Sequence, residues 1–83
     1  MKATMPPKRT GKKVPEAVRF GERVRQLRLA RKWTQEDLAA EAELNPVQIS
    51  HIENGANEPK LTTILRLARA LGITASELLR PFR

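Results

Sequence analysis

The sequence contains no cysteine, only one histidine and no glycine-rich phosphate loop. The lack of cysteine excludes disulfides, thiolate zinc sites and cysteine nucleophiles. A single histidine without partner ligands does not make a metal site. Ser50 beside His51 is no catalytic dyad, because adjacent residues of a helix point about 100° apart. We therefore expect no catalytic residue, no metal and no cofactor, and we expect that the chain is not an enzyme.

Aromatic residues and long apolar runs are also scarce. Aromatic side chains make up 4% of the 83 residues, so the core of the one small domain that this length allows must be aliphatic. No apolar run approaches the roughly 18 residues of a membrane-spanning helix. The basic N-terminus lacks the apolar region of a secretory signal. These absences predict a cytoplasmic protein without membrane contact.

Negative charge is in the minority, since 9 acidic residues face 16 Lys and Arg residues and the formal net charge is +7. Such an excess favours a polyanionic partner, and DNA, RNA and acidic membrane surfaces all qualify. Residues 1–15 contribute five of these charges and contain no acid. We expect them to form a disordered basic arm, followed by one folded domain over residues 16–83. The arm is either a solubilising tail or a segment that clasps DNA.

Residues 33–55 contain two consecutive helix-start signals. Thr34 is a favoured N-cap residue, and Asp37 stands three positions later, where its side chain can bind the free backbone amide of the cap. Asn45 and Gln48 repeat this pattern. Two short helices with a tight turn between them form a helix-turn-helix, which places its second helix in the DNA major groove.

Three further helices are expected over residues 16–32, 61–71 and 74–79, from apolar spacing and from glycine and proline stops. Thr74 and Glu77 form a third capping box at the start of the last of them. No stretch shows the alternation of a strand, and the connections are short. The sequence therefore predicts a compact all-α fold of five helices. The side chains expected to point inward are Phe20, Val24, Leu27, Leu38, Ala39, Ala42, Ile49, Ile52, Leu61, Ile64, Leu65, Ala68 and Leu71.

Several motifs stand in a fixed order along residues 19–80. They are R-x-L-R at Arg25–Arg28, W-T-Q-E-D-L-A at Trp33–Ala39, I-S-H-I-E-N-G at Ile49–Gly55, P-K-L-T-T-I-L-R-L-A-R-A-L-G-I-T at Pro59–Thr74, and E-L-L at Glu77–Leu79. In this order and spacing they resemble the lambda-repressor/Cro-like (XRE-type) helix-turn-helix domain. The resemblance implies a sequence-specific DNA-binding transcriptional regulator.

The resemblance also implies roles for individual residues. Arg28 and Glu53 match a family pair that joins the first helix to the end of the third. Gln35 matches the family's phosphate-binding glutamine, at a helix N-terminus that already attracts phosphate oxygens. The further candidates for phosphate contact are Asn54, Lys60, Lys32 and Arg31.

The second helix of the motif offers candidates for base recognition. With Ile49 and Ile52 inward, the helical period turns another set of residues toward DNA. That set is Val47, Gln48, Ser50 and His51. A glutamine can bind adenine with two hydrogen bonds, and a valine can touch a thymine methyl group. For the histidine, a solvated imidazole and a phosphate contact stay open as alternatives.

We expect double-stranded DNA as the partner, bound at the nucleoid by a homodimer on a two-fold operator with half-sites about 34 Å apart. The expected dimer interface is the apolar C-terminal end, at Leu78, Leu79, Pro81 and Phe82. Alternatively, Phe82 folds back onto the first helix and caps the core of a monomer. An alternative function is a protein-binding module of the same fold, such as an antitoxin with a cognate toxin or a coactivator adaptor.

Overall fold

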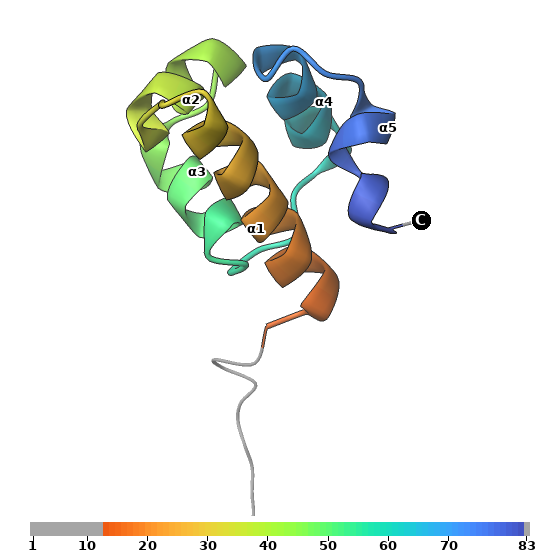
Figure 1. The fold of residues 1–83 in the computed structure, drawn as a ribbon. Helices are drawn as coiled ribbons and strands as arrows, with labels where there is room; N and C mark the ends of the chain where they lie inside the picture. Colours follow the sequence, from red (N-terminus) through yellow and green to blue (C-terminus); the bar gives the residue numbers. More distant parts are fainter. Residues whose placement is uncertain (1–12, 83) are drawn as a thin grey trace, which may run out of the picture.

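A computed structural model describes residues 13–82, which form five α-helices and a short 3-10 helix (Figure 1). Within this range there is no strand, so the predicted all-α fold of five helices is confirmed. The elements are α1 (Pro15–Ala30), α2 (Gln35–Ala42), α3 (Pro46–Glu53), α4 (Leu61–Ala70), α5 (Ala75–Leu78) and η2 (Arg80–Phe82).

The predicted basic arm falls mostly on residues 1–12, which lie outside the described range. The predicted end of the arm, at residue 15, needs a correction, because α1 begins at Pro15. Proline suits the first position of a helix, where no backbone N–H is required. The helix also ends earlier than expected, at Ala30, and Lys32 leaves it with a left-handed φ of 60°.

Local side-chain hydrogen bonds fix the start of three helices. In each, the N-cap side chain accepts from the backbone N–H three residues later, and the side chain of that later residue accepts from the backbone N–H of the cap. All three capping boxes stand where the sequence predicts them. The pairs are Thr34 with Asp37, Asn45 with Gln48, and Thr74 with Glu77.

The core is aliphatic, as expected, but the inward face of α4 differs from the prediction. Leu61 and Leu65 are 70% and 44% exposed, whereas Leu67 is fully buried. The core-facing set on α4 starts at Ile64 and continues through Leu67 and Ala68, so the helix is turned from the expected orientation. Aliphatic side chains occupy both faces, and spacing alone could not choose between them.

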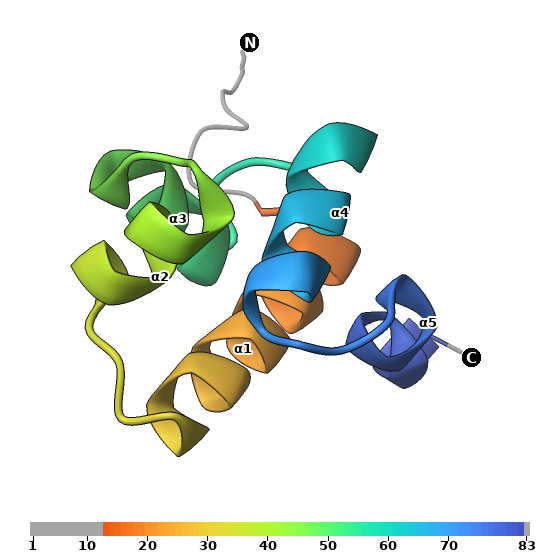
Figure 2. The same cartoon turned by 90° about the horizontal axis from the view of Figure 1, so that it is seen from above.

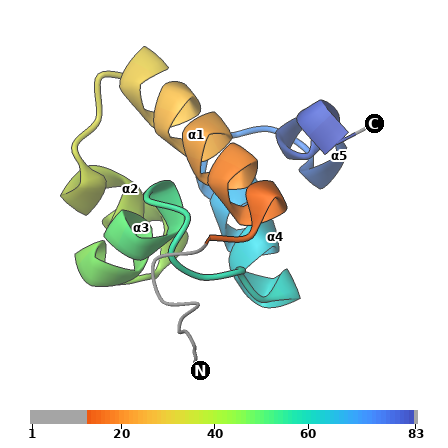
Figure 3. The same ribbon diagram turned by 90° about the horizontal axis from the view of Figure 1, so that it is seen from below.

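The position of α3 depends on its contact with α1. Figures 2 and 3 show α2 and α3 together on one side of α1 and α5 on the other, while α4, which overlaps α1 in both views, packs against α2. At Gly21 the backbones come so close that a Cβ atom would stand 2.2 Å from the carbonyl oxygen of Ile52. Glycine is required at this crossing, and it holds α3 against the longest helix of the fold.

No helix within residues 13–82 is long and apolar enough to cross a membrane.

Candidate nucleic-acid interface

The outer face of α3 carries the four residues predicted to read bases. Ile49 and Ile52 bury the opposite face in the core, as expected. Val47 is 61% exposed, so its side chain is accessible to a partner. Of the other three, Gln48 and His51 are exposed and Ser50 is half-buried.

A groove of about 430 Å³ runs between α3 and the segment that leads into α4. It places Lys60 in the same depression as Gln48 and His51, so a predicted phosphate contact adjoins two predicted base contacts. Asn57 and Thr63, neither of which was predicted from the sequence, add an amide and a hydroxyl to the lining. The groove therefore presents several hydrogen-bond donors that a phosphate backbone can use, and its lining also includes the acidic Glu58.

An ion pair joins α1 to the end of α3, as the resemblance predicted. Nε of Arg28 stands 2.7 Å from Oε2 of Glu53, and Nη2 donates to Oε1 at 3.0 Å. Nη1 of Arg28 also donates to the carbonyl oxygen of Trp33 at 2.7 Å. Both charged residues are buried. The hydrogen bond to Glu53 raises the pKa of the Arg28 guanidinium above its ordinary value, although burial acts in the opposite direction.

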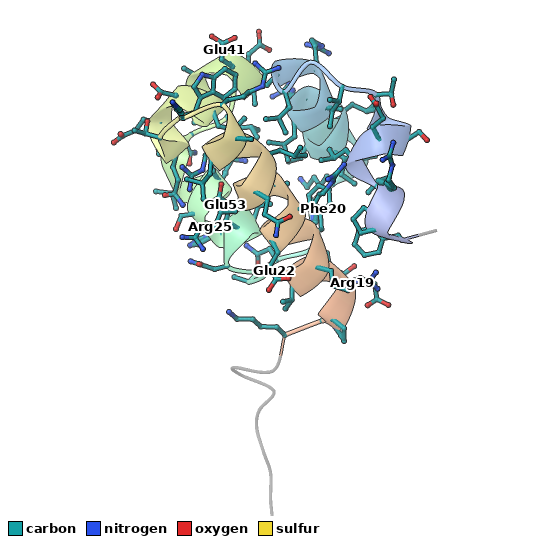
Figure 4. All side chains as sticks on the ribbon, in the orientation of Figure 1. Arg19, Phe20, Glu22, Arg25, Glu41 and Glu53 are labelled. Atoms are coloured by element: carbon teal, nitrogen blue, oxygen red, sulfur yellow. The ribbon has the colours of Figure 1, made fainter. Side chains whose placement is uncertain are left out.

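Gln35 is the first residue of α2 and is half-buried. Its side-chain amide nitrogen donates to Oε1 of Glu53 at 3.1 Å. Figure 4 shows Glu53 where α3 passes beside α1. The predicted phosphate-binding glutamine is therefore linked to the predicted structural pair, which no local signal in the sequence indicated, because 18 positions separate the two residues.

The remaining phosphate candidates have different surroundings. Lys32 is exposed beyond α1, and Asn54 is exposed as the C-cap of α3, with its carbonyl oxygen accepting from the side chain of Lys13. Arg31 is exposed and is also bonded within the protein. Its guanidinium donates to the carbonyl oxygen of Leu71 at 2.6 Å, which stabilises the junction of α1 and α4, and it lies over the ring of Trp33. A guanidinium has further N–H donors, so the phosphate contact of Arg31 stays a prediction.

The dimer interface predicted at the C-terminal end also needs a correction. Leu78 is 0% exposed and belongs to the core, so it offers no surface for a dimer contact. Phe82 packs on the core with the guanidinium of Arg19 above its ring, which is the alternative in which this residue folds back onto the first helix. Leu79, Pro81 and Phe82 stay partly exposed. Leu79 and Phe82 border an apolar groove of about 220 Å³.

Comparisons with known proteins agree with this geometry. A family model described as "Helix-turn-helix" matches residues 24–78. Control protein C.BamHI of Bacillus amyloliquefaciens is 41% identical over 61 residues, which are 72% of this chain and 75% of that protein. Control protein C.MunI of Mycoplasma sp is 37% identical over 62 residues, or 74% and 84% of the two chains. The structure of the restriction-modification controller protein C.AhdI from Aeromonas hydrophila matches with a TM-score of 0.76 and 38% identity, covering 78% of this chain and 98% of that chain.

Proposed function

The chain belongs to the helix-turn-helix family and is a DNA-binding transcriptional regulator, and from this premise we propose that it is a control protein of a restriction–modification system. The observation that carries the proposal is the similarity to control proteins over about three quarters of the chain, with the α2–α3 motif inside the matched region. The same relatives favour transcriptional control over the antitoxin and coactivator alternatives. The protein would act in the cytoplasm, at the nucleoid.

The proposed DNA contacts follow from the exposed face of α3. This helix would enter the major groove, with its outer residues against base edges and the groove beside Lys60 along one phosphate strand. Gln35, at the N-terminus of α2, would bind the strand on the other side. The proposed base contacts are Val47, Gln48, Ser50 and His51, and the proposed phosphate contacts are Gln35, Asn54, Lys60, Lys32 and Arg31.

We propose that the protein binds as a homodimer through an apolar surface of α4 and the C-terminal segment. Leu61 and Leu65 form an exposed aliphatic face on α4, although the sequence assigned them to the core. Leu79 and Phe82 border the second groove together with Ile64, another residue of α4. Exposed aliphatic residues favour association, so the proposed interface adds Leu61 and Leu65 to the predicted residues Leu79, Pro81 and Phe82, and it leaves out the buried Leu78.

Selection of bound duplexes from a random DNA pool tests the proposal. The full chain should enrich a two-fold sequence whose half-site centres are about one helical turn apart. A reporter that carries the promoter region of its own gene should then change its transcription when the chain is supplied. Enrichment of no sequence, or a reporter that is indifferent to the protein, would contradict the proposal.

A further inference from the structure

Glu53 accepts hydrogen bonds from two elements besides its own. Its carboxylate accepts hydrogen bonds from Nε and Nη2 of Arg28 in α1. It also accepts one from the side-chain amide of Gln35 in α2, at 3.1 Å. The Glu53 side chain is only 2% exposed. A buried carboxylate at the end of the recognition helix therefore reaches a residue at the protein surface, at the start of the preceding helix.

The amide nitrogen of Gln35 has a second hydrogen. A glutamine NH₂ group carries two donors, and within residues 13–82 one of them is used, by Glu53. The backbone N–H groups of Gln35 and Glu36 also lack partners in this range, as expected for the first turn of a helix. Three donors thus remain at the N-terminus of α2, where a phosphate oxygen is favoured.

We propose that Glu53 is a positioning residue for DNA binding, which holds the Gln35 amide in the orientation that donates to a phosphate. This inference rests on the proposed DNA contacts. A glutamine side chain that is free to rotate loses conformational entropy when it binds a ligand. Because the hydrogen bond to Glu53 already orders Gln35 in the free protein, this entropy is not lost on binding DNA. The guanidinium of Arg28 offsets the negative charge of Glu53, so the carboxylate can stand near a phosphate without strong repulsion. The buried pair therefore serves the phosphate contact as well as the placement of α3.

A double-mutant cycle on operator DNA separates these two roles. Gln35→Ala should weaken binding about tenfold, as expected for one hydrogen bond to a charged group. Glu53→Met keeps the length of the side chain and removes both oxygen acceptors, so it should weaken the wild-type protein by a larger factor than it weakens the Gln35→Ala variant, because the positioning effect needs Gln35. Equal factors in the two backgrounds would mean that Glu53 acts only by holding α3, and the inference would be wrong. Gln26→Ala, at an exposed site of α1, is the matched control.

Gln35→Asn keeps the proposal testable if Glu53→Met fails to fold. Asparagine retains the amide but is one methylene shorter, so it cannot span the distance to Glu53 from the same backbone position. The inference predicts an affinity as low as that of Gln35→Ala. Wild-type affinity in the asparagine variant would overturn it.

A measurement on the free protein distinguishes failure of this inference from failure of the proposed function. In NMR spectra without DNA, the two side-chain NH₂ protons of Gln35 should be well separated in chemical shift, because one is bound to a carboxylate. Random-coil shifts for both protons would overturn the inference even if DNA binding is normal. Separated shifts in a chain that binds no DNA would instead contradict the proposed function and the phosphate contact of Gln35 together.

Discussion

At Gly21 the absence of a side chain allows α1 and α3 to touch. A Cβ atom at this position would lie 2.2 Å from the carbonyl oxygen of Ile52 and 2.9 Å from that of Glu53. Both obstacles are backbone atoms of the recognition helix, so they cannot move aside as a flexible side chain would. Glycine inside a helix costs stability relative to alanine, so its presence at position 21 agrees with this packing requirement, which was not predicted from the sequence.

Gly21→Ala should therefore destabilise the fold, although alanine is the better helix former. We expect the free energy of unfolding to fall by about 3 kcal/mol, as for overpacking of a tight interface. Urea unfolding followed by circular dichroism measures this change. Glu22→Ala, on the exposed side of the same turn, should change stability by less than about 0.5 kcal/mol. Equal stability of the two variants would show that α1 and α3 are not this close.

Two glutamines at the proposed interface should behave differently when they are removed. Gln48→Ala should relax specificity at one or two base positions by roughly 1–3 kcal/mol per lost pair. Gln35→Ala should weaken binding to all sequences about equally, because a phosphate carries no sequence information. Competition assays against single-base operator variants report both effects. A uniform loss from both substitutions would contradict base readout by Gln48.

Among the elements, α1 holds the C-terminal half of the fold through its arginines. Carbonyl oxygens at the end of a helix lack hydrogen-bond partners within that helix. At the ends of α4, α5 and η2, such oxygens accept hydrogen bonds from guanidinium groups. Two of the arginines lie in α1, and the third, Arg31, directly follows it. This role could not be read from the sequence, where these side chains match those of a solvated face. The bonds run from Arg31 to Leu71 (2.6 Å), from Arg23 to Glu77 (2.8 Å) and from Arg19 to Pro81.

Removal of two of these arginines should loosen one part of the fold selectively. In an Arg19→Ala, Arg23→Ala variant, backbone amides of residues 75–82 should exchange with solvent about tenfold faster, while amides of α2 and α3 keep their rates. Hydrogen exchange measured by NMR resolves the two regions. Arg25→Ala is the control, because this exposed arginine of α1, labelled in Figure 4, makes no such carbonyl bond within the described residues. Faster exchange throughout the molecule would contradict a local role.

For the molecule as a whole, the features that could be predicted from spacing are those that depend on residues close together in the sequence. The three capping boxes involve residues three positions apart, so the helix starts could be read directly. The Arg28–Glu53 pair, whose members are 25 positions apart, came from the family resemblance. The rotation of α4 and the bond between Gln35 and Glu53 depend on how distant segments pack, and no spacing rule contains that information.

The apolar surface of α4 should control association. Sedimentation of the wild-type protein at high concentration should show a dimer, whereas a Leu61→Glu, Leu65→Glu variant should remain a folded monomer, since two charges would be desolvated in the interface. Leu29→Glu offers a matched control, because this leucine of α1 is also exposed, at 49%. Dimers in all three proteins would show that α4 is not the interface.

The salt dependence of operator binding tests the central claim, that this basic chain is a DNA-binding regulator, most directly. The affinity of the full chain for its selected operator should be measured at 50 and 200 mM salt. If about six phosphates are neutralised, the affinity should fall on the order of a thousandfold over this range, because bound counterions are released from DNA. An affinity that does not change with salt, or no measurable binding at 50 mM, would contradict the account.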